Sequence, residues 1–216
     1  MKSLNQYIQE KLIINKNYRC GDLSPKSFDE LRKIIEDRYN KLGPGTEQKP
    51  IDFNDIDVSN MDSFCNDKGK GIFQETKFKY IDISDWDVSN VKSTDSMFYN
   101  CVALKSVGDI SSWDVSNVKS TLNMFNGCEK LESVGNISKW DVSNVTDMRF
   151  MFRCCKKFNQ DISNWDVSNV TNMGHMFNFC KSFNQDLSSW DVSKVIYHGF
   201  MFYLCLIKEE YKPKFK

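Results

Sequence analysis

Hydrophobic and polar positions recur along this chain with a long, regular period. The hexapeptide Trp-Asp-Val-Ser-Asn-Val, or a close variant of it, appears five times, and its tryptophans are separated by 27, 27, 25 and 25 residues. A Met-Phe pair begins eleven residues after each tryptophan, and a cysteine lies fifteen residues after it. A sixth, degenerate copy begins at Ile56, which stands in the tryptophan position. Such a period is typical of proteins built from stacked repeats. The repeated positions are Trp86, Trp113, Trp140, Trp165 and Trp190, with Cys101, Cys128, Cys155, Cys180 and Cys205.

The spacing inside one copy predicts the local structure. Apolar residues from Ile83 to Val91 fit the leucine-rich-repeat pattern, so we expect a short strand that buries Trp86 and exposes Asp87. The apolar positions from Val145 to Phe158 have helical spacing and predict a short helix. The fold class predicted is therefore α/β: a leucine-rich-repeat-like right-handed solenoid of about six coils with parallel strands, capped by N-terminal helices. The expected strands are 85–89, 112–116, 139–143, 164–168 and 189–193.

The N-terminal part of the chain has its own pattern. Ser27 followed by Glu30 forms a capping-box pattern, and the apolar residues after it predict an amphipathic helix that ends at Gly43. A shorter helix is expected from Leu4 to Ile14. We expect both helices to cover the open edge of the first repeat. The predicted organisation is a helical cap and linker over 1–50, repeats over 51–205 and a polar tail over 206–216.

Charge and hydropathy narrow the class of protein. The 29 basic and 29 acidic residues balance, and the repeats are the more acidic part, which disfavours a nucleic-acid partner. No apolar run approaches the roughly 18 residues that cross a bilayer, so membrane insertion is not expected. The first residues show no export signal. We therefore expect a cytoplasmic protein whose cysteines are thiols.

The repeat itself is similar to a known family. The pattern D-I-S-x-W-D-V-S-N-V-T-x-M-x-x-M-F-x-x-C-x-x-F-N-Q, nearly intact from Asp161 to Gln185, resembles the BspA-like leucine-rich-repeat surface proteins, here in a short form without an export signal. That resemblance implies an adhesive or protein-binding role. The N-terminal segment is also similar to the lead-in of short relatives encoded by gut bacteria and their phages, which implies that surface or virion association is a further possible location.

One column of carboxylates is the most suggestive chemical feature. Stacking would place the aspartate after each tryptophan in a row, where neighbouring charges about 4.8 Å apart repel by roughly 3 kcal/mol at an effective dielectric constant near 20. Something must offset this repulsion. One interpretation is that each aspartate accepts hydrogen bonds from the Ser and Asn residues that follow it. The other is that a cation or a basic partner lies along the row.

The remaining chemistry-bearing residues favour structural roles. The cysteine column lacks any C-x2-C pair, so buried thiols are expected rather than disulfides or a zinc site. His175 and His198 lie in the variable part of successive copies, with no nucleophile at a useful spacing, and no glycine-rich phosphate loop is present. The sequence thus predicts a protein that is not an enzyme and that holds no cofactor and no metal.

These observations predict a non-catalytic protein-interaction module that binds another protein through the sheet face of the solenoid. One alternative is a structural or accessory virion or assembly protein of a phage or mobile element. A second alternative is a cation-dependent, adhesin-like binder that uses the aspartate row. The candidate partner-binding residues are Asp85, Asp87, Ser112, Asp114, Lys139, Asp141, Asn164, Asp166, Ser189 and Asp191.

Overall fold

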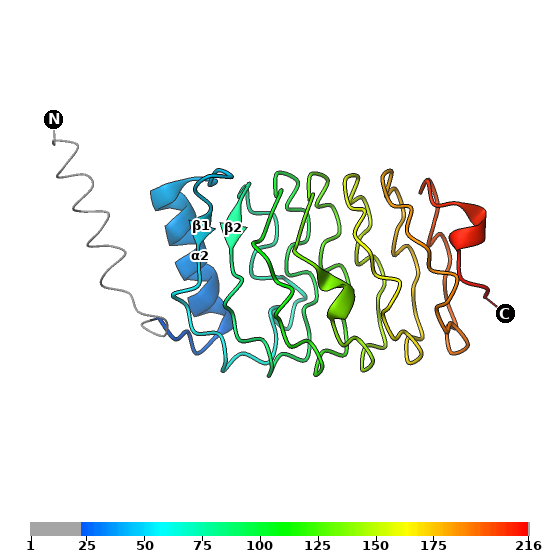
Figure 1. Ribbon diagram of the computed structural model, residues 1–216. Helices are drawn as coiled ribbons and strands as arrows, with labels where there is room; N and C mark the ends of the chain where they lie inside the picture. The colour runs from blue at the N-terminus through cyan, green and yellow to red at the C-terminus, as the bar shows by residue number, and fades with distance from the viewer. Residues whose placement is uncertain (1–22, 216) are drawn as a thin grey trace, which may run out of the picture.

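The structure, a computed structural model, describes residues 23–215. A single helix lies at one end of an elongated arrangement, and the chain then winds through a series of stacked loops to the C-terminus at the other end (Figure 1). The helix is followed along the stack by the strand pair and then by the loops that contain the five tryptophans. The predicted helix Leu4–Ile14 falls outside the described residues.

Helix α2, Phe28–Leu42, follows the prediction from its capping residues. The Ser27 hydroxyl accepts a hydrogen bond from the Glu30 amide, and Gly43, with a φ of 76°, ends the helix by donating its amide to the Tyr39 carbonyl. The Glu30 carboxylate accepts from the Lys26 amide at 2.7 Å, one residue before the position expected for a full capping box. The helix predicted between Ser27 and Gly43 is therefore confirmed.

The predicted α/β leucine-rich-repeat solenoid of six coils is wrong. The described residues form mostly turns and loops, with one α-helix and one two-stranded sheet, in which β1, Ile51–Asp52, pairs in parallel with β2, Ile81–Asp82. Two short 3-10 turns, η1 at Ile137–Lys139 and η2 at Glu209–Tyr211, complete the regular elements. None of the five expected strands forms, because Asp-x-Ser turns occupy those segments.

Consecutive repeats are nevertheless joined by backbone hydrogen bonds. Every second amide in the segment after the tryptophan donates to a carbonyl of the next repeat, as Ser96 does to Leu122 at 2.8 Å and Phe98 to Met124 at 2.9 Å. The amides between them bond within their own repeat, to carbonyls three residues earlier. We call this segment the ladder. Its parallel bridges run through Ser63, Ser93, Ser120, Asp147, Asn172 and Tyr197.

Left-handed backbone explains why the predicted helix after each tryptophan does not form. Two positions of every complete repeat, ten and fourteen residues after the tryptophan, have φ between 54° and 81°. An α-helix needs φ near −63°, so a left-handed residue every fourth position interrupts it. The apolar stripe from Val145 to Phe158 is accordingly buried by successive turns and not by a helix.

The core consists of columns of identical side chains, as the repeat predicted. Trp140 stacks between Trp113 and Trp165, with ring centroids 6.3 Å apart on both sides. Its indole N–H donates to the Ile110 carbonyl of the preceding repeat at 3.0 Å, and the other four tryptophans make the equivalent bond. The tryptophans are 3–5% exposed, so their predicted burial is confirmed. In the last repeat, Phe202 and Cys205 are only partly buried.

Candidate functional site

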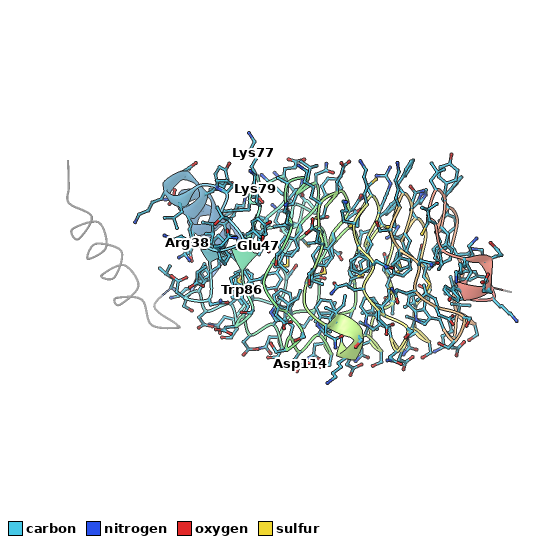
Figure 2. All side chains as sticks on the ribbon, turned by 45° about the horizontal axis from the view of Figure 1, so that its top comes forward. Arg38, Glu47, Lys77, Lys79, Trp86 and Asp114 are labelled. Atoms are coloured by element: carbon cyan, nitrogen blue, oxygen red, sulfur yellow. The ribbon has the colours of Figure 1, made fainter. Side chains whose placement is uncertain are left out.

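The ten residues predicted to bind a partner lie on one exposed rim of the stack. In Figure 2, Asp114 lies at this rim, on the side of the molecule away from Lys77 and Lys79. Each aspartate of the column accepts hydrogen bonds from the serine two residues later. Asp141, for example, accepts from the Ser143 amide at 3.1 Å and from its hydroxyl at 2.6 Å. The same amide bond occurs at Asp87, Asp114, Asp166 and Asp191.

These local bonds support the first interpretation of the carboxylate row. The hydrogen bonds from Ser116 hold the pKa of Asp114 below its usual value, and those from Ser168 do the same for Asp166. Each carboxylate therefore has its own donors, and no cation is needed to stabilise the charged form. The predicted hydrogen bonds from the serines are therefore confirmed, whereas the predicted bonds from the asparagines to the aspartates are not formed among the described residues.

The asparagine column beside the aspartates also has a structural use. Asn144 donates its side-chain amide to the Ser116 carbonyl of the preceding repeat at 2.8 Å, and Asn169 donates to the Ser143 carbonyl at the same distance. In the last repeat Lys194 replaces the asparagine, and its ammonium donates to the Asn169 side chain at 2.6 Å. Hydrogen bonds between repeats thus hold the rim together. Its aspartate and asparagine columns make the same bonds in successive repeats, so these columns do not distinguish one repeat from another.

A second surface, which sequence reasoning missed, lies along the ladder. Here the side chains differ from repeat to repeat, and toward the C-terminal end they become aromatic. His175 stacks between Phe150 and Phe200, with centroid distances of 4.8 and 5.1 Å, and Tyr203 packs edge-on against Phe200 at 5.8 Å. We call this surface the aromatic patch. Its members are Phe150, His175, Phe179, Tyr197, Phe200 and Tyr203.

Two glycines determine where one of these rings lies. A Cβ atom on Gly174 would meet the Tyr197 ring at 2.4 Å, and one on Gly199 would meet the same side chain at 2.6 Å. The equivalent position carries Asp95 in an earlier repeat, where its carboxylate accepts a hydrogen bond from the hydroxyl of Ser120, the residue equivalent to Tyr197. The Tyr197 ring instead lies against these two glycines, and the residue is 46% exposed.

Positive charge accompanies the aromatic residues. Arg149 and Arg153 are the two arginines among residues 51–216, and both lie in the ladder segment next to Phe150. Arg149 forms an ion pair with Asp147 at 2.6 Å. Partial burial lowers the pKa of His175, and the nearby Arg153 guanidinium lowers it further. The lowered pKa favours the neutral imidazole, which suits its place between two phenylalanines.

The cysteine column is structural. Within residues 23–215 all cysteines are free thiols, and the thiol of Cys155 donates to the Phe125 carbonyl of the preceding repeat at 3.0 Å. Burial raises the pKa values of the Cys155 and Cys180 thiols well above the usual value, which disfavours the thiolate. The described part of the chain holds no group of three or more His, Cys, Asp or Glu residues arranged to bind a metal. It also contains no helix with the length and apolarity needed to cross a membrane.

Comparison with known proteins places this repeat architecture in a family. The sequence model described as "Mycoplasma protein of unknown function, DUF285" matches residues 47–134 and again residues 130–208. These matches cover most of the chain, which therefore belongs to this family and, with it, to the BspA-like and Mycoplasma group of repeat proteins. Neither the curated proteins nor the solved structures yielded a significant match.

The aromatic patch leaves a signal in the sequence that a column-by-column comparison of the repeats can detect. Ten residues after the tryptophan the chain has Ser96, Asn123, Phe150, His175 and Phe200, while the core columns barely change. A position that differs between repeats whose core residues are nearly constant is a candidate for a binding role, because packing does not fix its residue. The helix was predicted from its buried apolar stripe between Val145 and Phe158, and Phe150 does not belong to that stripe.

Proposed function

We propose that this chain is a non-catalytic protein-binding module that contacts another protein through the aromatic patch. The observation that carries the proposal is the grouping of Tyr, Phe and Arg side chains on one part of the ladder. Tyr, Phe and Arg are enriched at the centres of protein interfaces, and Tyr and Arg are prominent among the residues that dominate binding energy. Phe200 and Tyr203 are 61% and 51% exposed, which leaves apolar area available for a partner.

The repeated scaffold suits this role. Core columns and backbone bonds hold the ladder at a fixed geometry, so a residue can change on its surface without disturbing the stack. The stacking of His175 against Phe150 and Phe200 restricts these rings before binding. A partner then loses less of its binding free energy to the ordering of side chains. The resemblance of the repeat to BspA-like surface proteins is consistent with this role.

The ten rim residues contribute less to this proposal. Their carboxylates already accept hydrogen bonds from serines of their own turns, so a partner that took these acceptors would have to replace existing bonds. Asp85, Lys139 and Asn164 on the same rim are exposed and available for secondary contacts.

A photocrosslinking experiment tests the proposal on the full chain. A benzoyl-phenylalanine replaces Tyr203 in one variant and Tyr99 in the other, because both tyrosines occupy the same position of their repeats and only Tyr203 belongs to the patch. The expected result in host extract is a discrete crosslinked protein from position 203, little from position 99, and loss of the crosslink when Phe200→Ser is added. Equal crosslinking at both positions, or crosslinking to assembled particles that Phe200→Ser leaves unchanged, would contradict it.

A further inference from the structure

The last repeat leaves four backbone amides without acceptors. In the preceding repeat the equivalent amides donate to the carbonyls of Tyr197, Gly199, Met201 and Tyr203, each at 2.9 Å. Within the described part of the chain, no acceptor faces the amides of His198, Phe200, Phe202 and Leu204. We call this row the terminal edge. It ends the ladder at the C-terminal side of the stack (Figure 1).

The described part of the C-terminal tail, residues 206–215, covers the side chains beside this edge but forms no hydrogen bond with its amides. Phe215 stacks on the His198 ring with centroids 3.9 Å apart, and the Lys212 ammonium lies 5.8 Å from the centre of the Phe202 ring. The tail is fixed to the last repeat elsewhere, since the Tyr211 carbonyl accepts from the Leu187 amide at 2.8 Å. As far as residue 215, the tail thus closes the core and gives the amide row no acceptor.

The opposite end of the ladder is closed. There the Arg32 guanidinium of α2 donates to the carbonyls of Ile72 and Gln74 at 2.8 and 3.1 Å. These carbonyls are the ones that would accept from a preceding repeat, because Phe73 and Glu75 donate onward to the next repeat as the inner residues do. A second copy of the chain therefore cannot place its first repeat on the terminal edge while α2 is in position.

The chemistry of the terminal edge restricts its occupant. An ordinary β-strand presents amides and carbonyls together along one edge. The carbonyls of His198, Phe200 and Phe202 already accept from amides of their own turns, so the amides of such a strand would meet only carbonyls that already have a donor. A segment that directs carbonyls alone toward the edge pairs the four amides and brings no unpaired donors of its own. Within this protein that is the property of the repeat's own turning backbone.

We propose that the terminal edge binds a segment of another polypeptide with the same turning repeat backbone, added in parallel as the next rung of the ladder. Exposed apolar residues at this edge agree with this occupant. One face of the Phe200 ring already packs on His175, and Leu204 is 53% exposed, so an added rung would cover apolar surface. This proposal does not rest on the proposed function, although Phe200 belongs to both surfaces, with its amide in the terminal edge and its ring in the aromatic patch. It concerns backbone amides at the end of the stack, whereas the aromatic patch acts through side chains on its surface.

Amide hydrogen exchange on the full chain tests the proposal, with a synthetic peptide of residues 168–183 as the probe. This peptide carries the carbonyls of the ladder segment. The amides of His198, Phe200, Phe202 and Leu204 are expected to exchange fast in the free protein and to become protected when the peptide is added. A scrambled peptide of the same composition is expected to give no protection.

A matched pair of variants localises the binding. Leu204→Lys should weaken peptide binding at least about tenfold, because the new ammonium would be covered without an acceptor. Asn100→Lys is the control, since it alters the same repeat position where the amide is already bonded to the Asn126 carbonyl at 2.7 Å.

Three results would overturn the proposal: slow exchange of the terminal-edge amides in the free protein, equal protection by the scrambled peptide, or protection that rises with protein concentration alone. A failure of the Tyr203 crosslinking experiment would contradict the proposed function and would not change the results of this exchange experiment.

Discussion

The two ends of the stack treat their exposed backbone groups differently. At the N-terminal end, α2 supplies guanidinium groups: Arg32 takes two ladder carbonyls, and Arg38 pairs with Asp55 at 2.6 and 2.8 Å. At the C-terminal end, a short tail covers the core while the amides of Phe200 and Leu204 find no acceptor among residues 23–215. The comparison shows that burying a core and satisfying a backbone edge are separate problems, and that this chain solves both at one end only.

The largest effect should separate the centre of the stack from its open end. Trp140→Ala should cost about 3 to 5 kcal/mol of unfolding free energy, because the ring is lost from between two neighbours. Trp190→Ala should cost clearly less, since only the tail lies beyond it. Chemical denaturation of both variants measures the difference, and equal losses at the two sites would show that the stack does not depend on nearest neighbours.

The next effect concerns the two caps. Arg32→Met should cost about 1 to 3 kcal/mol, because it leaves the Ile72 and Gln74 carbonyls without their charged donor. Lys212→Met removes a cation from the C-terminal tail, where the ammonium pairs with the exposed Glu209, and should change stability by no more than about 0.5 kcal/mol. Thermal unfolding compares the pair. A larger loss for the lysine variant would reverse our account of which end is closed.

A smaller, pH-dependent effect on stability is expected in the part of the ladder near Asp95, where polar residues stand in place of the aromatic ones. Burial raises the pKa of Asp95, although the Ser120 hydroxyl and Leu122 amide donate to its carboxylate. A raised folded-state pKa means that the carboxyl group favours folding in its protonated form, and this contribution is lost as pH rises through the folded pKa. Asp95→Asn should therefore raise the melting temperature at pH 7. The difference should vanish well below pH 3.8, the ordinary pKa, where both forms are neutral.

The smallest effect is expected on the rim, where the same Asp-x-Ser turn recurs in each of the five tryptophan repeats. Asp141→Asn should barely change stability, because asparagine keeps an acceptor for the Ser143 donors while charge repulsion falls. Millimolar calcium should leave the melting temperature of the parent protein unchanged. Calcium stabilisation that disappears in the Asp141→Asn, Asp166→Asn double variant would restore the cation-binding interpretation of the row.

The sequence is informative where a single local signal decides the structure. Ser27 and Gly43 define α2 because side-chain capping and a left-handed glycine act within a few residues. The buried columns are equally legible, since a tryptophan repeated five times has to occupy equivalent places. The rim was also placed correctly as an exposed surface, together with the local hydrogen bonds of its aspartates.

The backbone between these signals could not be predicted in the same way. Apolar residues spaced three and four apart suit either a helix or a series of tight turns. What decides between them is the left-handed backbone at Phe150, Cys154 and Phe179, and none of these residue types favours that conformation by itself. The hydrogen bonds from neighbouring repeats impose it. The aromatic patch was missed because its members lie outside the buried apolar stripe from which the helix was predicted.

Those left-handed positions also bear on how the protein can change over evolutionary time. Glycine would fit each of them without steric conflict, yet Gly127 is the one glycine in the two columns, and the others carry side chains at a cost of roughly 1 to 2 kcal/mol each. Strain of this kind is often concentrated where residues are retained for function. The two columns are thus places where side chains are held against the preference of the backbone, and exchange for glycine is the change that the backbone there resists least.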